Sequence, residues 1–312
     1  MNDMPNQNVI EDIAIEAGID VAYVEKDWFA VNLLKHIIDY RSNFDTHILF
    51  TGGTSLSKGY DLIERFSEDL DFLVSDHDTL NKSKRSKFKK DLIDYIQNIN
   101  GFSIEEGSIK SFDNNKSFTF LVNYPRLFRS VSLRDQLKIE MKFQNPTLPY
   151  QNRSVRSFVD KYQKPNDEIM IPCVSPIEIS GDKLSALSWR ILNCKRNSRG
   201  YKPQIMRHLH DLAWLKKYID ESPDDFTNLA NKAYESDQKQ GGYKIAQMSF
   251  PQRLEKTLNL LDGHSGYKDD YNKYVLAMSY AKDDGRISYE RAVSLLKDIC
   301  TTITSKNLLE NI

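Results

Sequence analysis

A strand, two glycines, a helix and a second strand are predicted in succession between residues 47 and 75, and this order constrains the chain more than any other feature. The strand, His47 to Thr51, is rich in apolar residues and ends at Gly52 and Gly53. Thr54 and Ser55 then cap a helix that is expected to bury Leu56, Tyr60, Ile63 and Phe66. Paired glycines allow close backbone approach, and free N–H groups at a helix start favour an anion. We therefore expect the four residues from Gly52 to Ser55 to bind phosphate.

The second strand, Asp69 to Ser75, carries two carboxylates on one face. Side chains two residues apart in a strand share a face, so Asp69 and Asp71 project together while Leu70 and Phe72 point to the core. Two neighbouring carboxylates repel each other, and a pair of divalent metal ions relieves the repulsion. Paired glycines alone are a common turn, and D-x-D alone is a common solvated strand end. Their combination predicts a site that holds a nucleoside triphosphate with its metals for in-line displacement.

These two motifs resemble a known family. The pattern G-G-T-S-L-x-K at residues 52–58, followed by R-x-S-x-D-x-D-F at residues 65–72, is similar to the AbiEii/AbiGii toxin family of bacterial nucleotidyltransferases, in the DNA polymerase β-like superfamily. The resemblance extends from about Val24 to Leu215. It implies an α+β fold, with a polymerase β-like mixed sheet flanked by helices and followed by an all-helical C-terminal half.

Two further patterns, in the C-terminal half, resemble the second half of the same family. They are K-L-x-A-L-x-x-R, beginning at Lys183, and R-x-x-x-D-L, beginning at Arg207. Taken alone, Lys183 could be a snorkelling surface lysine, and Arg207 and Asp211 an ordinary ion pair four residues apart. The resemblance instead implies functional roles for Lys183 and Asp211, with Asp211 orienting the lysine or the nucleotide ribose. The chain departs from the family at His208, where many members have an aspartate.

Periodicity divides the chain near residue 175. Helical spacing over residues 9–42, broken at Gly18, predicts two helices that brace the sheet, and Glu25-Lys26-Asp27-Trp28 is either a family feature or a solvated helix turn. Alternation over residues 118–124 and 133–143 predicts two antiparallel strands. We expect a catalytic domain over residues 1–175 and a helical domain over residues 176–312 that closes the active-site cleft and begins with Ser175 as cap.

Glu140 is the candidate third carboxylate. It lies on the polar face of its predicted strand, in the chain region where polymerase β-like enzymes place a third acid. The alternative is that Glu140 pairs with Lys138 or Lys142 on a wet face. Asp135 is a possible substitute, although strand parity places it with the core-facing residues.

The resemblance and the local chemistry together assign roles to these residues. We expect a nucleoside triphosphate as substrate and Mg²⁺ or Mn²⁺ as cofactor. The metal ligands are predicted to be Asp69, Asp71 and Glu140, and the catalytic set adds Lys58, Lys183 and Asp211. The nucleotide-binding residues are predicted to be Gly52, Gly53, Thr54, Ser55, Lys58, Arg65, Ser67 and Lys183. A cap or a turn explains Ser67 equally well.

Composition limits the partners. The formal net charge is -1, so contact with nucleic acid must come from local basic patches. The most cationic part of the chain lies between residues 183 and 217, where the loop 193–202 combines positive charge with Tyr201. We expect this loop to contact an RNA acceptor end, and a solvated loop is the alternative. The basic run at residues 82–90 has the same two interpretations.

The remaining features point to the cytoplasm. Cys173, Cys194 and Cys300 have no metal-binding or disulfide-like spacing, which predicts reduced thiols. The first residues do not resemble a signal peptide, and no apolar stretch approaches the length of a membrane span. We expect a cytoplasmic monomer with no membrane contact.

The main functional hypothesis is a metal-dependent transferase that moves a nucleoside monophosphate onto an acceptor hydroxyl. The resemblance implies the toxin of a type IV toxin-antitoxin or phage-defence system, with a tRNA 3′ end as acceptor and a cognate antitoxin as partner. A protein hydroxyl or a small molecule such as an aminoglycoside are alternative acceptors. A non-catalytic, nucleotide-binding regulatory module is the alternative of another class, since one fold serves many functions.

Overall fold

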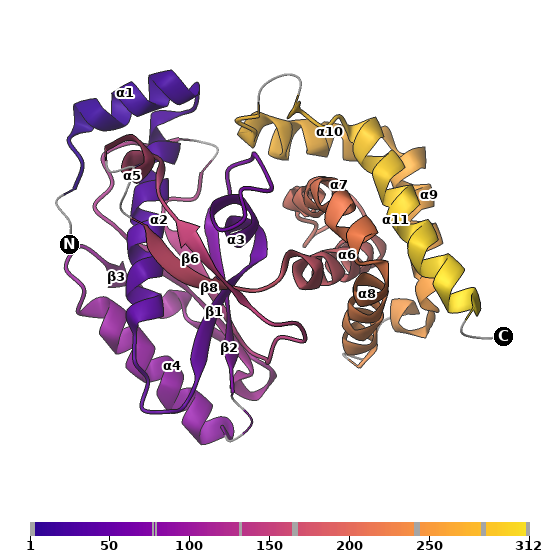
Figure 1. Ribbon diagram of the computed structural model, residues 1–312, viewed down its shortest axis with the longest axis horizontal. Helices are drawn as coiled ribbons and strands as arrows, with labels where there is room; N and C mark the ends of the chain where they lie inside the picture. The colour runs from indigo at the N-terminus through magenta and orange to yellow at the C-terminus, as the bar shows by residue number, and fades with distance from the viewer. Residues whose placement is uncertain are drawn as a thin grey trace. The chain divides into compact units, whose positions relative to one another are not determined.

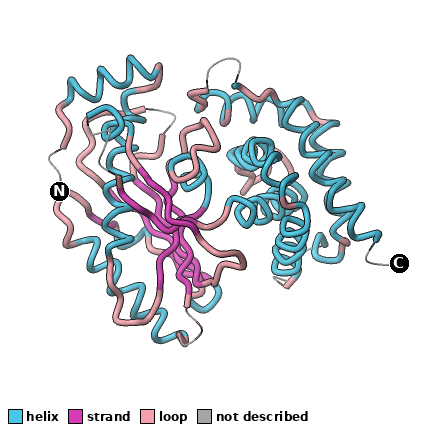
Figure 2. The backbone as a smooth tube through the Cα atoms, in the orientation of Figure 1, coloured by secondary structure: helices cyan, strands magenta, loops and turns pink. Residues whose placement is uncertain are grey.

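A computed structural model describes residues 4–76, 78, 80–130, 133–163, 168–239, 244–281 and 285–309. Internal contacts divide the chain into two units. The first contains Met1–Asp61 and Phe66–Val174, and the second contains Leu62–Arg65 and Ser175–Ile312. Within the described residues, the strands lie in the first unit and the second unit is helical (Figure 2).

The first unit is built on a mixed sheet. In the described part of the chain the order is β3-β5-β6-β2-β1-β8-β7, and β4 adds to β5. The pairs β2/β6 and β1/β8 are parallel, whereas β1/β2, β5/β6 and β7/β8 are antiparallel. The strands are β1 His47–Thr51, β2 Asp69–Ser75, β3 Ser103–Ile104, β4 Lys110–Phe112, β5 Ser117–Asn123, β6 Leu137–Phe143, β7 Gln151–Val155 and β8 Ile169–Cys173. The predicted mixed sheet with flanking helices is confirmed.

Helices α2 and α4 lie along one face of this sheet (Figure 1). Phe88 of α4 packs edge-on against Phe143 of β6 with ring centroids 5.3 Å apart, and Phe29 of α2 contacts Tyr124 just after β5. Alternate residues of β5 and β6 are buried, as a period of two requires. The helices of this unit are α1 Gln7–Ala17, α2 Val21–Asp39, α3 Gly52–Lys58, α4 Lys82–Gln97 and α5 Phe158–Gln163.

Local signals explain where the first two helices begin and end. Asn6 and Asp20 accept backbone N–H hydrogen bonds as the N-caps of α1 and α2. Gly18 ends α1 in the left-handed region, with φ 64°, where a residue without a β-carbon is unstrained. The predicted pair of helices broken at Gly18 is therefore confirmed.

Of the two interpretations of Glu25-Lys26-Asp27-Trp28, the solvated helix turn is wrong, because the side chains of Glu25, Lys26 and Asp27 are buried. Successive residues of a helix point about 100° apart, so the three reach different segments. Glu25 accepts the backbone N–H groups of Leu127 and Phe128 at 2.7 and 3.1 Å. Burial raises the pKa of Glu25, and these two hydrogen bonds oppose that shift.

The other two charges of this turn are paired. Lys26 Nζ lies 2.9 Å from Glu68 Oε2, and Asp27 Oδ1 lies 2.6 Å from Lys58 Nζ. Asp27 Oδ2 also accepts the N–H of Phe158 at 2.7 Å, which fixes the start of α5. Burial lowers the pKa of both lysines, and the partner carboxylates oppose the shift. Helix α2 thus holds the segments before β2 and at the end of α3.

The strand predicted over residues 133–143 begins only at Leu137. The main chain of Arg134 leaves the sheet pattern because its N–H donates to Glu68 and its C=O accepts from Lys26. Strand parity therefore does not apply to Asp135. This exposed residue forms an ion pair with Arg126, which leaves it in no position to replace Glu140 in the strand.

The second unit is a set of packed helices. They are α6 Pro176–Asn193, α7 Met206–Glu221, α8 Pro223–Gln238, α9 Phe250–Gly263, α10 Ser265–Tyr274 and α11 Tyr289–Leu309. Ser175 occupies the N-cap position of α6 without a side-chain hydrogen bond. Arg253 of α9 is fully buried and ties three helices together, since it donates to Ser188 of α6 at 2.8 Å and pairs with Asp237 of α8 at 2.7 Å.

Residues 62–65 belong to the second unit, which the sequence did not indicate. The backbone oxygen of Glu64 accepts hydrogen bonds from the N–H of Tyr280 and the hydroxyl of Ser279, both at 3.0 Å. Arg65 forms an isolated bridge with Ser279. The chain therefore passes from the first unit to the second and back again immediately before β2.

No helix within the described ranges combines the length and apolar character needed to cross a bilayer.

The buried pair of Lys26 and Glu68 predicts a large stability effect. Lys26→Met should lower the free energy of unfolding by about 3–5 kcal/mol, because the Glu68 carboxylate would stay buried without its counter-charge. Urea unfolding measures this change. Lys35→Met, at an exposed position of the same helix, is the control and should change stability by about 0.5 kcal/mol or less. A loss below about 1 kcal/mol for Lys26→Met would show that the pair does not brace the unit.

Candidate active site

The two predicted metal carboxylates lie on the partly exposed face of β2. Asp69 and Asp71 are half-buried, whereas Leu70 and Phe72 between and beyond them are buried. In the sheet register, Asp71 is opposite Thr51 at the end of β1 and opposite Glu140 in β6. Directly opposed residues of neighbouring strands point to the same side. The sheet thus brings Asp71 and Glu140 together, as the hypothesis of a third carboxylate requires.

Glu140 also forms an ion pair with Lys138, its neighbour on the same face of β6. Lys138 in turn is opposite Asp69 in the parallel register. Both interpretations of Glu140 therefore describe its surroundings, and its part in metal binding stays a prediction.

The residues present fit a metal site that the substrate completes. Within the described residues, no group of three His, Cys, Asp or Glu side chains is arranged to hold a metal ion. Mg²⁺ in nucleotide-dependent enzymes is usually held by one or two carboxylates together with substrate phosphates and water. Asp69 and Asp71 supply that protein share.

Gly52 lies directly beneath one of these carboxylates. It begins α3 with φ +77°, and a β-carbon placed on it would lie 2.8 Å from Cγ of Asp71. A side chain at this position is thus excluded by both the backbone and the carboxylate. The glycine that was predicted to admit a phosphate also makes room for a candidate metal ligand.

Helix α3 differs from its prediction at both ends. It begins at Gly52, two residues before the expected cap, and ends at Lys58. Tyr60, Ile63 and Phe66 follow it in irregular structure. Gly59, the residue that follows α3, lies close to Cys173, and a β-carbon there would be 3.0 Å from its Sγ.

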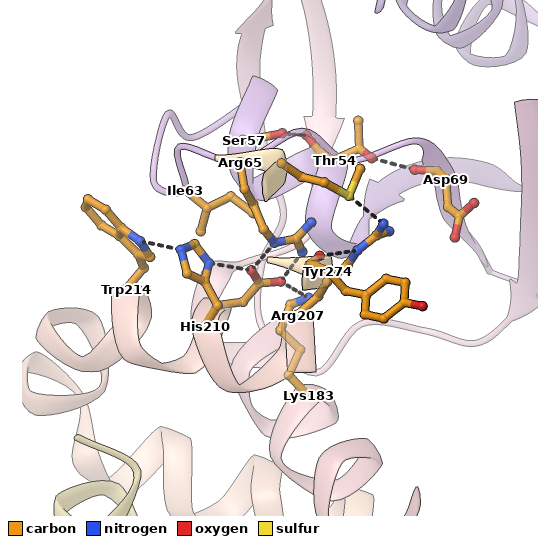
Figure 3. Close-up of polar contacts among 12 residues, drawn as sticks. Thr54, Ser57, Ile63, Arg65, Asp69, Lys183, Arg207, His210, Trp214 and Tyr274 are labelled. Atoms are coloured by element: carbon orange, nitrogen blue, oxygen red, sulfur yellow. Dashed lines mark hydrogen bonds and ion pairs between the residues drawn. The ribbon is translucent and has the colours of Figure 1, made fainter. Parts of the chain in front are cut away.

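The side chains of α3 are mostly turned into the first unit. The Thr54 hydroxyl donates to the backbone oxygen of Asp69, and the Ser57 hydroxyl donates to that of Thr54 at 3.1 Å (Figure 3). Ser55 is fully buried. Burial raises the pKa of the Cys173 thiol to about 11, and the nearby Ser55 hydroxyl opposes this shift.

Lys58 was predicted to contact phosphate, and its placement favours a structural role. Its ammonium is buried, is paired with Asp27, and lies 3.9 Å above the ring of Phe158. Contact with a phosphate would require this pairing to be loosened, and the predicted contact stays a prediction. Gly53 is buried and Ser67 is partly exposed; their contacts with a nucleotide stay predictions.

A second cluster of candidate residues lies in the second unit, around Asp211 of α7. Arg65 donates to both carboxylate oxygens, at 2.8 and 2.6 Å, and Lys183 of α6 donates to Oδ2 at 2.7 Å (Figure 3). Asp211 is completely buried, and both cations are buried as well. The two cations and one carboxylate carry a net charge of +1.

Electrostatics keep Asp211 ionised. Burial by itself raises the pKa of this carboxyl group, but the charges of Arg65 and Lys183 outweigh it and hold the pKa well below 3.8. His210 Nδ1 lies 3.4 Å from the carboxylate, and His210 Nε2 accepts from the indole of Trp214 at 3.1 Å (Figure 3). The imidazole is therefore neutral with its proton on Nδ1, and burial lowers its pKa.

His210 and Trp214 were missed by the sequence analysis, since their spacing matches any amphipathic helix.

Arg65 was predicted to bind phosphate, and the structure places it on Asp211 instead. Arg207, the other end of the anticipated ion pair, contacts the backbone oxygen of Tyr274 and the sulfur of Met278.

The cationic loop at residues 193–202 borders a pocket of about 410 Å³ in the second unit. Arg196 pairs with Asp270 of α10 through two hydrogen bonds, at 2.8 and 3.1 Å, and the Tyr201 hydroxyl donates to the same carboxylate at 2.8 Å. The loop is thus attached to α10, while Arg199 and Lys202 of the loop are exposed and the exposed Lys273 lines the pocket. This arrangement leaves positive charge and aromatic rings on a fixed surface.

Two comparisons with known proteins found a match. A family model described as nucleotidyl transferase AbiEii toxin, type IV TA system, matches residues 33–296. Among solved structures, the chain is similar to MenT4, a nucleotidyltransferase toxin from Mycobacterium tuberculosis, with 14% sequence identity and a TM-score of 0.51 over 96% of this chain and 99% of that one. This likeness shows a shared fold. A search of curated proteins found no match.

The close approach of Gly52 to Asp71 predicts a specific effect of adding one methyl group. Gly52→Ala should lower the free energy of unfolding by at least about 1 kcal/mol more than Gly18→Ala, because a clash with Asp71 adds to the strain of positive φ. Gly18 is a matched control, since its φ is +64° and a β-carbon there would meet nothing within 4 Å. Urea unfolding of both variants measures the difference. Equal losses of unfolding free energy in the two variants would show that the Asp71 side chain moves aside without cost.

The Asp211 cluster predicts a dependence on pH. Asp211→Asn should cost about 3–5 kcal/mol at pH 7, because two buried cations would lose their counter-charge. The folded-state pKa is depressed, so this stabilisation is present above the unfolded pKa of about 3.9 and is lost as pH falls through the lower folded value.

Urea unfolding of wild type and variant from pH 8 down to pH 3 measures the effect. The difference should be constant above about pH 5 and shrink below about pH 4. Asp220→Asn, an exposed position of the same helix, should change stability by less than about 1 kcal/mol. A difference that grows on acidification would contradict the assignment.

Proposed function

Because the chain belongs to the AbiEii family of nucleotidyltransferase toxins from type IV toxin-antitoxin systems, we propose that it transfers a nucleoside monophosphate from a nucleoside triphosphate to an RNA hydroxyl, with a tRNA 3′ end as the first candidate. The observation that carries this proposal is the register that groups Asp69, Asp71 and Glu140 on one face, with Gly52 beneath Asp71.

Asp69 and Asp71 would hold Mg²⁺ at this face, with Glu140 as a third oxygen donor. When bound, such ions lower the pKa of an acceptor hydroxyl and neutralise the triphosphate and the pyrophosphate that leaves. The chain's own part is to fix the carboxylates before substrate arrives. Thr54 does so for the Asp69 main chain, and Gly52 admits the Asp71 side chain.

In the second unit, Asp211 acts as the anchor of two cations. Both of its oxygens accept hydrogen bonds from Arg65 or Lys183, so neither is available to a metal ion or a ribose without displacing a cation. The surplus positive charge supports the prediction that Lys183 faces a nucleotide phosphate, where it is worth most as charge develops in the transition state.

The support for an RNA acceptor comes from the charge and the aromatic rings of the cationic loop and its pocket. Lys273 is exposed at the pocket, Tyr201 and Tyr274 line it, and the adjoining loop adds the exposed cations Arg199 and Lys202. Positive charge beside aromatic rings suits a single-stranded polyanion with stacking bases. A tRNA 3′ end carries both the negative charge and the bases that such a surface would bind, which supports it as the first candidate. The same site would serve toxicity and phage defence, and a cognate antitoxin would control it.

The test is incubation of the purified protein with bulk tRNA, Mg²⁺ and each α-³²P-labelled nucleoside triphosphate in turn. We expect label on tRNA with at least one nucleotide, abolished by a chelator and reduced more than about a hundredfold in Asp69→Ala. Asp94→Ala, an exposed carboxylate of α4, is the control and should retain activity. Parallel reactions contain protein extract or aminoglycosides.

Each alternative has its own outcome. Label on protein or on an aminoglycoside, with none on tRNA, would replace RNA as the acceptor. Saturable nucleotide binding without label or pyrophosphate from any acceptor would favour the regulatory module.

A further inference from the structure

Arg134 is held at its main chain by two buried charges of the first unit. Its N–H donates to Glu68 Oε2 at 3.1 Å, and its C=O accepts from Lys26 Nζ at 2.6 Å. Glu68 and Lys26 pair with each other at 2.9 Å. Because both its N–H and its C=O are hydrogen-bonded, Arg134 has little freedom to shift relative to the start of β2.

The side chain of Arg134 reaches the first candidate metal ligand. Its Nη1 lies 2.8 Å from Asp69 Oδ1. The backbone oxygen of Asp69 accepts from Thr54, so this aspartate is bound through both its main chain and its side chain. Among the described residues, Asp69 Oδ2 has no partner.

This contact is too exposed to contribute much to stability. The side chains of Arg134 and Asp69 are 37% and 31% exposed. An ion pair with this much access to solvent contributes roughly 1 kcal/mol or less to the free energy of unfolding. By contrast, the Lys26 and Glu68 pair that sets the position of Arg134 is buried. Lys26 and Glu68 thus hold the main chain of Arg134 from the buried side, while its guanidinium contacts Asp69 and is in contact with solvent. Such an arrangement is typical of a residue that orients a neighbouring ligand.

We propose that Arg134 is a positioning residue for nucleotidyl transfer. Its guanidinium occupies Asp69 Oδ1 and fixes the carboxylate so that Oδ2 faces the substrate side. This inference rests on the proposed function of Asp69 as a metal ligand and adds a residue that no motif indicated. Lys26 and Glu68 act through Arg134.

The first test compares kinetics of Arg134→Ala with those of Arg129→Ala, an exposed arginine nearby in the chain. Loss of a charge-assisted hydrogen bond to a ligand should lower kcat about tenfold to a hundredfold with little change in KM for the nucleotide. Added guanidinium at non-denaturing concentration should restore activity at least about threefold, and Arg134→Lys should retain more activity than the alanine variant. The melting temperature should stay close to that of the wild type.

The second test does not depend on turnover. Crystal structures of wild type and Arg134→Ala, grown without metal, should show the Asp69 side chain in one rotamer in the wild type and in several in the variant. If the wild type transfers no nucleotide at all, the proposed function fails while this structural test still stands.

Three results would overturn the positioning role. One is an unchanged kcat in Arg134→Ala while Asp69→Ala abolishes transfer. Another is a single, unchanged Asp69 rotamer in the variant. The third is a large drop in melting temperature with no recovery by guanidinium, which would make Arg134 a structural residue only.

Discussion

Three consecutive buried charges on α2 are the constraint on which the first unit depends. Removing a charge from water is expensive unless a partner meets it, so Glu25, Lys26 and Asp27 each require a specific segment at a specific place. Glu25 binds the loop at residues 127–128, and Lys26 binds the segment before β2. Asp27 binds the end of α3 and the start of α5. If α2 packed through apolar side chains alone, it could shift along its neighbours at little cost. The ion pairs at 2.6 and 2.9 Å fix its position because a shift would break them.

The second unit is likewise held by buried charged groups that are paired, at Asp211 and at Arg253. Asp211 fixes Arg65 and Lys183, which come from chain segments separated by more than a hundred residues. Arg253 fixes α6 and α8 against α9. Both units therefore place candidate functional side chains by buried polar networks, and apolar packing supplies the bulk of the core.

Crowding adds a second kind of precision at the site itself. The carboxylate of Asp71 stands where Gly52 would carry a side chain, so the glycine turn and the D-x-D strand are one structural unit. The two motifs are therefore coupled through one contact, the approach of Gly52 to the Asp71 side chain. Gly52 is required for two reasons, because its φ is positive and because the Asp71 carboxylate leaves no room for a β-carbon.

The sequence by itself determined the features that depend on local chemistry. The order of strand, glycines, helix and strand was predictable, as were the shared face of Asp69 and Asp71, the break at Gly18 and the helical second half, because periods of 2 and 3.6 and the conformational freedom of glycine act over a few residues. Local motifs also carried the family. Only the tertiary structure decided which charges meet. Lys26 finds Glu68 across 42 residues and Arg65 finds Asp211 across 146, and the same packing assigned Lys58 to Asp27, shortened the strand at Leu137 and brought Arg134 to Asp69. No local pattern specifies such partners, because the free energy that selects them arises from desolvation, which exists only once the chain has folded around them.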